Sequence, residues 1–246
     1  MTAVARVWPA ATVVIIGTGP SLTKADVDAC RGRAKVIAIK QAIEYAPWAD
    51  CLYASGADAS RFWNRVGPEL TWYEGLRYTL DPKAAAFATV LQNTGELGLE
   101  RAPTGLRTGR NSGTAAINLA YHLGAARIIL LGFDFQFATK HHYFGNHFHN
   151  IPPPVEDFRR MLPPIVEALA AEGVSVVNCS RETSITCVPR LSLDEALAAP
   201  CRIRSLQMAI ISAMTSSPTT CPTCNGSGRM KGEKCPTCHG TGRMPK

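Results

Sequence analysis

A run of β-branched residues that enters a glycine-rich turn near the start of the chain restricts the fold more than any other segment. Residues 13–16 are Val-Val-Ile-Ile, followed at once by Gly17-Thr18-Gly19-Pro20-Ser21-Leu22 and a helix-like stretch over 23–30. Such a run is typical of a strand buried on both faces of a parallel sheet. Glycines let a backbone approach a ligand, and the N–H groups at a helix start favour phosphate or carboxylate. The segment predicts either a strand–turn–helix anion site, with Ser21 or Thr23 capping the helix, or a tight turn without a ligand.

Strand-like and helix-like segments alternate along most of the remaining chain. Strands are expected over residues 35–39, 51–54, 87–91, 127–132 and 174–178. Helices are expected over residues 41–46, 112–123, 156–172 and 193–198. The third of these helices should break at Pro163-Pro164, because proline lacks the N–H that a helix interior needs. The alternation predicts an α/β fold: a doubly wound, mostly parallel, Rossmann-like sheet with helices on both faces.

Composition limits the class of protein. The 246-residue chain is 46% hydrophobic and 18% charged, which is typical of a folded domain and not of a disordered chain. No run approaches the ~18 consecutive apolar residues that a membrane span needs, and no signal peptide is evident. Nine cysteines, an odd count, favour a reducing compartment over a disulfide framework. The sequence therefore predicts a cytoplasmic protein.

Polar residues follow several of the expected strands, where open parallel sheets bind their ligands. These residues are Lys40, Ser55, Asp58 and Asp134. Asn111 and Ser112 stand at the start of the helix expected over 112–123, and either can cap it. Together they are candidates for a ligand pocket at one edge of the sheet. Ordinary loop polarity and a simple helix cap explain each residue equally well when it is taken singly.

Histidines concentrate in the loop that follows the strand over 127–132. The chain has six histidines, and four fall in this loop: His141, His142, His147 and His149. Imidazole can take up a proton near neutral pH, so the first interpretation is a general base. A divalent metal site that includes Asp134 is the second, and a solvated loop is the third.

Two copies of a Cys-x-x-Cys-x-Gly-x-Gly unit stand near the end of the sequence. Their cysteines are Cys221, Cys224, Cys235 and Cys238. Each pair can hold a metal ion with two thiolates, and two pairs complete the tetrahedral site of one structural zinc ion. A redox role for either pair is the alternative.

These motifs divide the sequence into three expected regions. Residues 1–200 form the α/β domain, 201–220 a linker, and 221–246 the zinc-binding module. The last 46 residues, 201–246, carry seven Lys or Arg side chains and one acidic side chain. Four zinc-bound thiolates would reduce that positive charge, so contact with nucleic acid or with a protein partner stays open.

Several motifs occur in an order that resembles a known superfamily. They are Gly17-Thr18-Gly19-Pro20-Ser21-Leu22, Asn111-Ser112-Gly113, Leu131-Gly132-Phe133-Asp134, His142-Tyr143-Phe144-Gly145-Asn146-His147 and Asn178-Cys179-Ser180. Over residues 12–198 the chain resembles the superfamily that joins bacterial CMP-dependent sialyltransferases to a phage and archaeal family of Rossmann-like proteins. The cysteine repeat is similar to the zinc-binding region of DnaJ-type chaperones.

The resemblance implies a transferase that uses a nucleotide-activated donor, such as a CMP-sugar, and needs no metal for its chemistry. His147 would deprotonate the acceptor hydroxyl, Tyr143 would contact the leaving group or substrate, and His142 would stand beside them. The implied nucleotide site consists of Gly17, Thr18, Gly19, Pro20, Ser21, Lys40, Ser55, Asp58, Asn111, Ser112, Gly113, Gly132 and Asp134.

Two alternatives accompany this interpretation. The sialyltransferases carry Asn where this chain has Thr18, Lys40 and Ser55. The archaeal pterin diphosphokinases of the same superfamily share the Gly-x-Gly-Pro-Ser turn and transfer a diphosphate from ATP with magnesium, for which Asp58 and Asp134 would be the ligands. The other alternative is a catalytically inactive phage module whose zinc-binding tail contacts nucleic acid or protein.

Overall fold

The structure, a computed structural model, describes residues 2–56, 58–136, 142–144, 155–199, 227, 229–230 and 233–234. The chain divides into two compact units, Met1–Arg204 and Ser205–Lys246. In the described part of the chain, no helix is long and apolar enough to cross a membrane.

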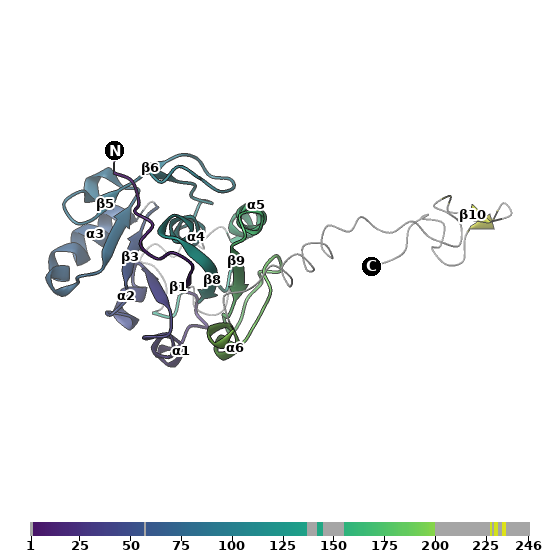
Figure 1. The fold of residues 1–246 in the computed structure, drawn as a ribbon, viewed down its shortest axis with the longest axis horizontal. Helices are drawn as coiled ribbons and strands as arrows, with labels where there is room; N and C mark the ends of the chain where they lie inside the picture. The colour runs from purple at the N-terminus through teal and green to yellow at the C-terminus, as the bar shows by residue number, and fades with distance from the viewer. Residues whose placement is uncertain are drawn as a thin grey trace. The chain divides into compact units, whose positions relative to one another are not determined.

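Seven parallel strands form the central sheet of the first unit (Figure 1). In chain order they are β1 (Ala11–Ile16), β2 (Lys35–Ile39), β3 (Cys51–Ala54), β4 (Leu76–Thr79), β5 (Thr89–Val90), β8 (Ala125–Leu131) and β9 (Ser175–Asn178). Their order across the sheet is β5-β4-β3-β2-β1-β8-β9. The chain therefore builds outward from β1 in one direction and then crosses over to β8 on the other side. Such a reversal of strand order is where doubly wound sheets bind ligands, beyond the carboxyl ends of the strands.

Strand β1 is buried on both faces, as its sequence predicts. Val13 and Ile15 belong to one apolar core and Val14 and Ile16 to the other, because successive side chains in a strand point to opposite faces. Helices α4 (Ser112–Leu123) and α5 (Val155–Ala171) cover the first face. Helices α1 (Lys24–Ala29), α2 (Ala42–Tyr45), α3 (Ala59–Val66) and α6 (Leu193–Ala198) cover the second (Figure 1). The predicted parallel α/β sheet with helices on both faces is confirmed.

The predicted break in α5 is wrong, because the helix runs through Pro163 and Pro164 without interruption. Both prolines are half-buried, while the core-facing side chains of the helix, Leu162, Ile165, Val166 and Leu169, are buried. An interior proline costs about 3 kcal/mol. Burial of each large apolar side chain contributes roughly 1.5–3 kcal/mol, so the packed face of α5 offsets the two prolines.

The segment between β3 and α4 contains more structure than its sequence pattern indicates. The expected strand over 87–91 is reduced to Thr89–Val90, because the chain turns at Phe87 after the short helix η2 (Pro82–Ala84). Strand β4 and the helix η1 (Gly67–Trp72) were not expected. A second small parallel sheet pairs β6 (Gln92–Asn93) with β7 (Gly105–Leu106).

In the second unit, the described residues form an antiparallel hairpin. Strand β10 (Arg229–Met230) pairs with β11 (Glu233–Lys234), and Arg229 lies opposite Lys234. The four cysteines of the expected zinc site and the expected linker over 201–220 lie outside the described residues.

Candidate nucleotide-binding site

The carboxyl edge of the sheet brings together segments that are far apart in the sequence. The turn after β1, the residues after β2, β3 and β8, and the start of α4 all lie at this edge. His147, Gly145 and Asn146 of the expected catalytic segment lie outside the described residues, whereas His142 and Tyr143 are described. The structure thus describes the residues predicted to bind a nucleotide and, of the residues predicted to be catalytic, His142 and Tyr143.

The glycines after β1 pack against the segment that follows β8. Gly17 N–H donates to Leu131 O (2.8 Å) and Gly19 N–H donates to Gly132 O (2.9 Å). A Cβ added at Gly19 would lie 2.3 Å from Asp134 Oδ1, and one added at Gly17 would lie 2.6 Å from Gly132 O. Glycine is therefore required here for the close approach of two loops of this chain. An anion at this turn would have to compete with the carbonyl groups that already accept these N–H groups.

Asp134 holds the same turn in place through hydrogen bonds to Ser21. Its carboxylate is 2% exposed and accepts from Ser21 N–H (2.7 Å) and from the Ser21 hydroxyl (2.8 Å). Burial raises the pKa of this carboxyl, the two Ser21 hydrogen bonds lower it, and the nearby Glu182 raises it, with a net upward shift. Both carboxylate oxygens thus serve the fold, which does not fit a magnesium ligand in this conformation.

His142 and Tyr143 lie directly over the glycine-rich turn. His142 Nδ1 is 2.8 Å from Thr18 Oγ1, and Tyr143 N–H donates to Thr18 O (3.1 Å). The Tyr143 hydroxyl donates to Gln41 O (2.6 Å), and its ring packs on Tyr45 with the ring centres 4.1 Å apart. Burial raises the pKa of Tyr143, so its hydroxyl stays protonated. His142 and Tyr143 therefore lie at the sheet edge that the sequence predicts for them.

The start of α4 meets the end of β3. Asn111 caps the helix by accepting from Thr114 N–H (2.8 Å). The Ser112 hydroxyl donates to Ser55 O (2.9 Å), and the two serine hydroxyls are 3.5 Å apart. The first turn of this 12-residue helix carries no acidic side chain. Its positive end is thus open to an anion on electrostatic grounds. Gly113 is required for packing, because a Cβ there would lie 2.8 Å from the Phe133 ring.

Lys40 supplies a positive charge at the end of β2, next to the strand that leads to Ser55. Its N–H donates to Tyr53 O in the neighbouring strand (3.0 Å), and its ammonium group pairs with Asp58. The Lys40 side chain is 14% exposed and that of Asp58 is 39% exposed. Lys40 is therefore held in place, while Asp58 faces solvent more. An Asp58 carboxylate that is already paired with a lysine is a poor magnesium ligand.

Backbone conformations that are rare for non-glycine residues gather at this edge. Lys40 (φ 49°), Arg110 (φ 60°) and Phe135 (φ 45°) all adopt left-handed backbone after β2, before α4 and after β8. Such a conformation costs about 1–3 kcal/mol per residue and persists where the surrounding structure enforces it, which is common in ligand sites.

A cavity of about 390 Å³ opens beside the α4 start. Ser55 and Asn111, two of the residues predicted from the sequence, line it. The remaining lining residues include Ser60, Asp81, Lys83, Asn93, Thr108 and Arg110, which the sequence analysis missed. The signal that could have found Asp81 and Lys83 is the short alternation Leu-Arg-Tyr-Thr before Asp81-Pro82, which is strand β4 (Leu76–Thr79).

Metal ligands do not gather in the described part of the chain, where no group of three His, Cys, Asp or Glu side chains could hold an ion. Comparisons with protein families, with curated proteins and with solved structures find no match for this chain.

Proposed function

We propose that the first unit is a nucleotide-dependent transferase, most similar in chemistry to the sialyltransferases, that uses a nucleotide-activated donor. The observation that carries the proposal is the arrangement at the strand reversal. Ser55 and Ser112 meet at the start of α4, Ser55 lines a polar cavity there, and Lys40 follows the neighbouring strand β2 at the same edge. Charge and hydrogen-bond donors placed at this edge suit the phosphate of a nucleotide.

The proposed chemistry is an inverting displacement at the activated carbon of the donor. The acceptor hydroxyl attacks that carbon, His147 accepts the hydroxyl proton, and the nucleotide leaves with the bonding electrons as a phosphate anion. The positive end of α4 and the Lys40 ammonium group would stabilise the charge of that leaving group. Tyr143 would position the donor from its site over Thr18, as its hydrogen bonds to the turn and to Gln41 support.

The structure supports a donor that binds without magnesium. The diphosphokinase alternative needs carboxylates that can turn their oxygens toward a metal ion. Asp134 is bound to Ser21 through both oxygens, and Asp58 is paired with Lys40. A magnesium-dependent ATP response is therefore the result that would favour the diphosphokinase over the sialyltransferase-like enzyme.

A thermal-shift screen tests the proposal directly. The full chain is heated with CMP, CDP, UDP, GDP, ATP or CMP-sialic acid, each with and without magnesium. A ligand at one hundred times its Kd stabilises the native state by about 2.7 kcal/mol, which such a screen detects. We expect a cytidine nucleotide to raise the Tm without magnesium. A screen in which no nucleotide raises the Tm would favour the inactive binding module.

A variant at the proposed base separates catalysis from binding. His147→Ala should abolish the release of CMP from CMP-sialic acid and should keep the cytidine-dependent rise in Tm. His149→Ala, two residues along the same loop, is the matched control and should keep both. Unchanged turnover in His147→Ala would remove this residue from the mechanism.

For the second unit, we propose one structural zinc ion held by Cys221, Cys224, Cys235 and Cys238. The hairpin of β10 and β11 supports this, because it stands between the two cysteine pairs and ends directly before Cys235. Reduced protein should contain about one zinc ion per chain, because two Cys-x-x-Cys pairs make one four-thiolate site. Metal analysis should find the zinc lost in Cys221→Ser/Cys235→Ser and kept in Cys187→Ser, and zinc-free wild-type protein would contradict the proposal.

A further inference from the structure

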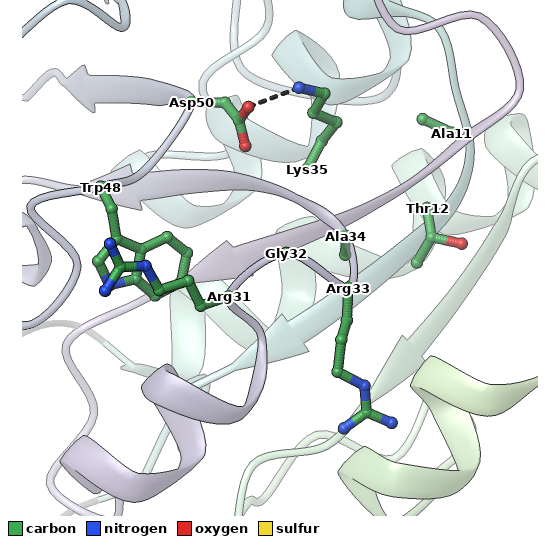
Figure 2. A pocket seen from close by; sticks show the side chains of 9 residues that line it. All are labelled: Ala11, Thr12, Arg31, Gly32, Arg33, Ala34, Lys35, Trp48 and Asp50. Carbon is green, nitrogen blue, oxygen red and sulfur yellow. Dashed lines mark hydrogen bonds and ion pairs between the residues drawn. The ribbon is translucent and has the colours of Figure 1, made fainter.

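A second cavity, of about 620 Å³, opens to solvent at the amino edge of the sheet, the opposite edge from the proposed nucleotide site (Figure 2). It is formed by the starts of β1 and β2, the turn that joins α1 to β2, and the segment before β3. Three basic side chains and one tryptophan line it, against a single carboxylate: Arg31, Arg33, Lys35, Trp48 and Asp50. The proposed transferase makes no use of this cavity.

An aromatic and a guanidinium group stack on one side of the cavity. The Arg31 guanidinium lies over the Trp48 ring, 5.8 Å from its centre, as Figure 2 shows. Trp48 is half-buried, which fixes the ring, and Arg31 is exposed. Within the described residues, no carboxylate pairs with Arg31. Indole and guanidinium planes are both surfaces on which nucleobases stack.

Lys35 and Arg33 each form an ion pair that a phosphate can replace. Lys35 Nζ is 2.6 Å from Asp50 Oδ1, but Asp50 also accepts from Val36 N–H (2.9 Å) and would stay hydrogen-bonded without the lysine. Arg33 pairs with Asp194 (3.1 Å), whose side chain is 87% exposed. Ion pairs as exposed as this one contribute little, so a phosphate can displace Asp194.

We propose that this cavity binds single-stranded nucleic acid, with a base stacked on the Trp48–Arg31 pair and backbone phosphates held by Arg33 and Lys35. In Figure 2 the Lys35 and Arg33 side chains point away from each other, so they can hold different phosphates of one strand. A duplex would not expose a base face to Trp48. This combination of an aromatic platform with flanking cations in an open groove is the physical basis of strand binding without sequence preference.

Fluorescence anisotropy with a labelled twelve-nucleotide oligothymidine tests the proposal on the full chain. Trp48→Leu should weaken binding at least about fivefold, because a base loses its stacking partner. Arg33→Gln/Lys35→Gln, which removes the two cations assigned to phosphates, should also weaken binding and should lower the slope of log affinity against log salt by about 1.4. Lys24→Gln/Arg65→Gln, which removes two cations of the same unit outside the cavity, is the control and should keep the wild-type affinity.

Three outcomes would overturn the proposal. The first is absence of oligothymidine binding. The second is binding of thymidine monophosphate as tight as that of the oligonucleotide, which would indicate a site for free nucleotides. Binding that Arg33→Gln/Lys35→Gln leaves unchanged and Arg229→Gln/Lys234→Gln abolishes would assign the strand to the second unit. The cavity residues and Lys40 lie at opposite edges of the sheet, so the cavity variants should keep the rise in Tm with cytidine nucleotides. The two proposals can therefore fail independently.

Discussion

Helices α1 and α4 both begin at the carboxyl edge of the sheet, and they differ in how fully the chain's own groups occupy their first turns. At α1, Thr23 caps the helix, Asp26 stands in the first turn, and Ser21 N–H is bound to Asp134. At α4, Asn111 caps the helix and no acidic side chain follows in its first turn. The glycine-rich turn before α1 is therefore closed by this chain's own groups. The difference shows that a glycine-rich turn can serve the packing of the chain itself, while the α4 start, which has no acidic side chain in its first turn, is electrostatically more favourable for a phosphate.

The largest predicted effect is a loss of stability at the glycine-rich turn before α1. Gly19→Ala would place a Cβ 2.3 Å from Asp134 Oδ1 and 2.7 Å from Gly132 O. Because a buried carboxylate and a backbone carbonyl cannot both retreat, we expect a loss of about 3 kcal/mol in the free energy of unfolding, measured with urea. Gly98→Ala, where nothing lies within 4 Å of the new Cβ, is the control. It should lose about 1 kcal/mol, from its left-handed backbone alone. Equal losses in both variants would mean that the two loops do not pack closely.

The two helix caps give an intermediate effect that separates stability from binding. Thr23→Ala and Asn111→Ala should each lower the free energy of unfolding by about 1 kcal/mol, because each removes one capping hydrogen bond. The rise in Tm with a cytidine nucleotide should fall in Asn111→Ala and stay at the wild-type value in Thr23→Ala. The reverse result would move the phosphate to the glycine-rich turn.

The smallest effect is a pH dependence of stability that arises from Asp134. Burial raises the pKa of this carboxyl above its usual value of 3.8, so the native state holds the proton more tightly than the unfolded state. Between 3.8 and the raised pKa, the contribution of Asp134 to stability therefore falls as the pH rises. Asp134→Asn cannot titrate, so the stability of wild type relative to this variant should decline across that window. A constant difference from pH 3 to pH 7 in urea titrations would contradict the raised pKa.

The sequence predicted most of the sheet because its strands are buried on both faces and are marked by β-branched runs. It also predicted that Lys40, Ser55, Ser112 and Asp134 would lie at one edge, since parallel strands end together. It could not show that Asp134 binds Ser21, because that contact joins residues 113 positions apart.

Strand β4 and the cavity beside it were missed because the strand has only four residues, Leu76–Thr79, which is too short a run for its alternation to be clear. The helix α5 was predicted to break because local propensity took precedence over its buried face, which is visible only once the core is assembled. The amino-edge cavity was missed for a related reason. Arg31 and Trp48 are 17 positions apart, and only the folded chain stacks them.

The most direct test of the central claim is calorimetric titration of the full chain with CMP in the absence of magnesium. It compares wild type, Lys40→Met and Lys24→Met, two variants that each remove a lysine paired with an aspartate. We expect wild type and Lys24→Met to bind CMP alike and Lys40→Met to lose at least about tenfold in affinity, as a charge-assisted contact to phosphate is removed. CMP binding that is equal in all three proteins, or absent from wild type, would contradict a nucleotide site at the carboxyl edge.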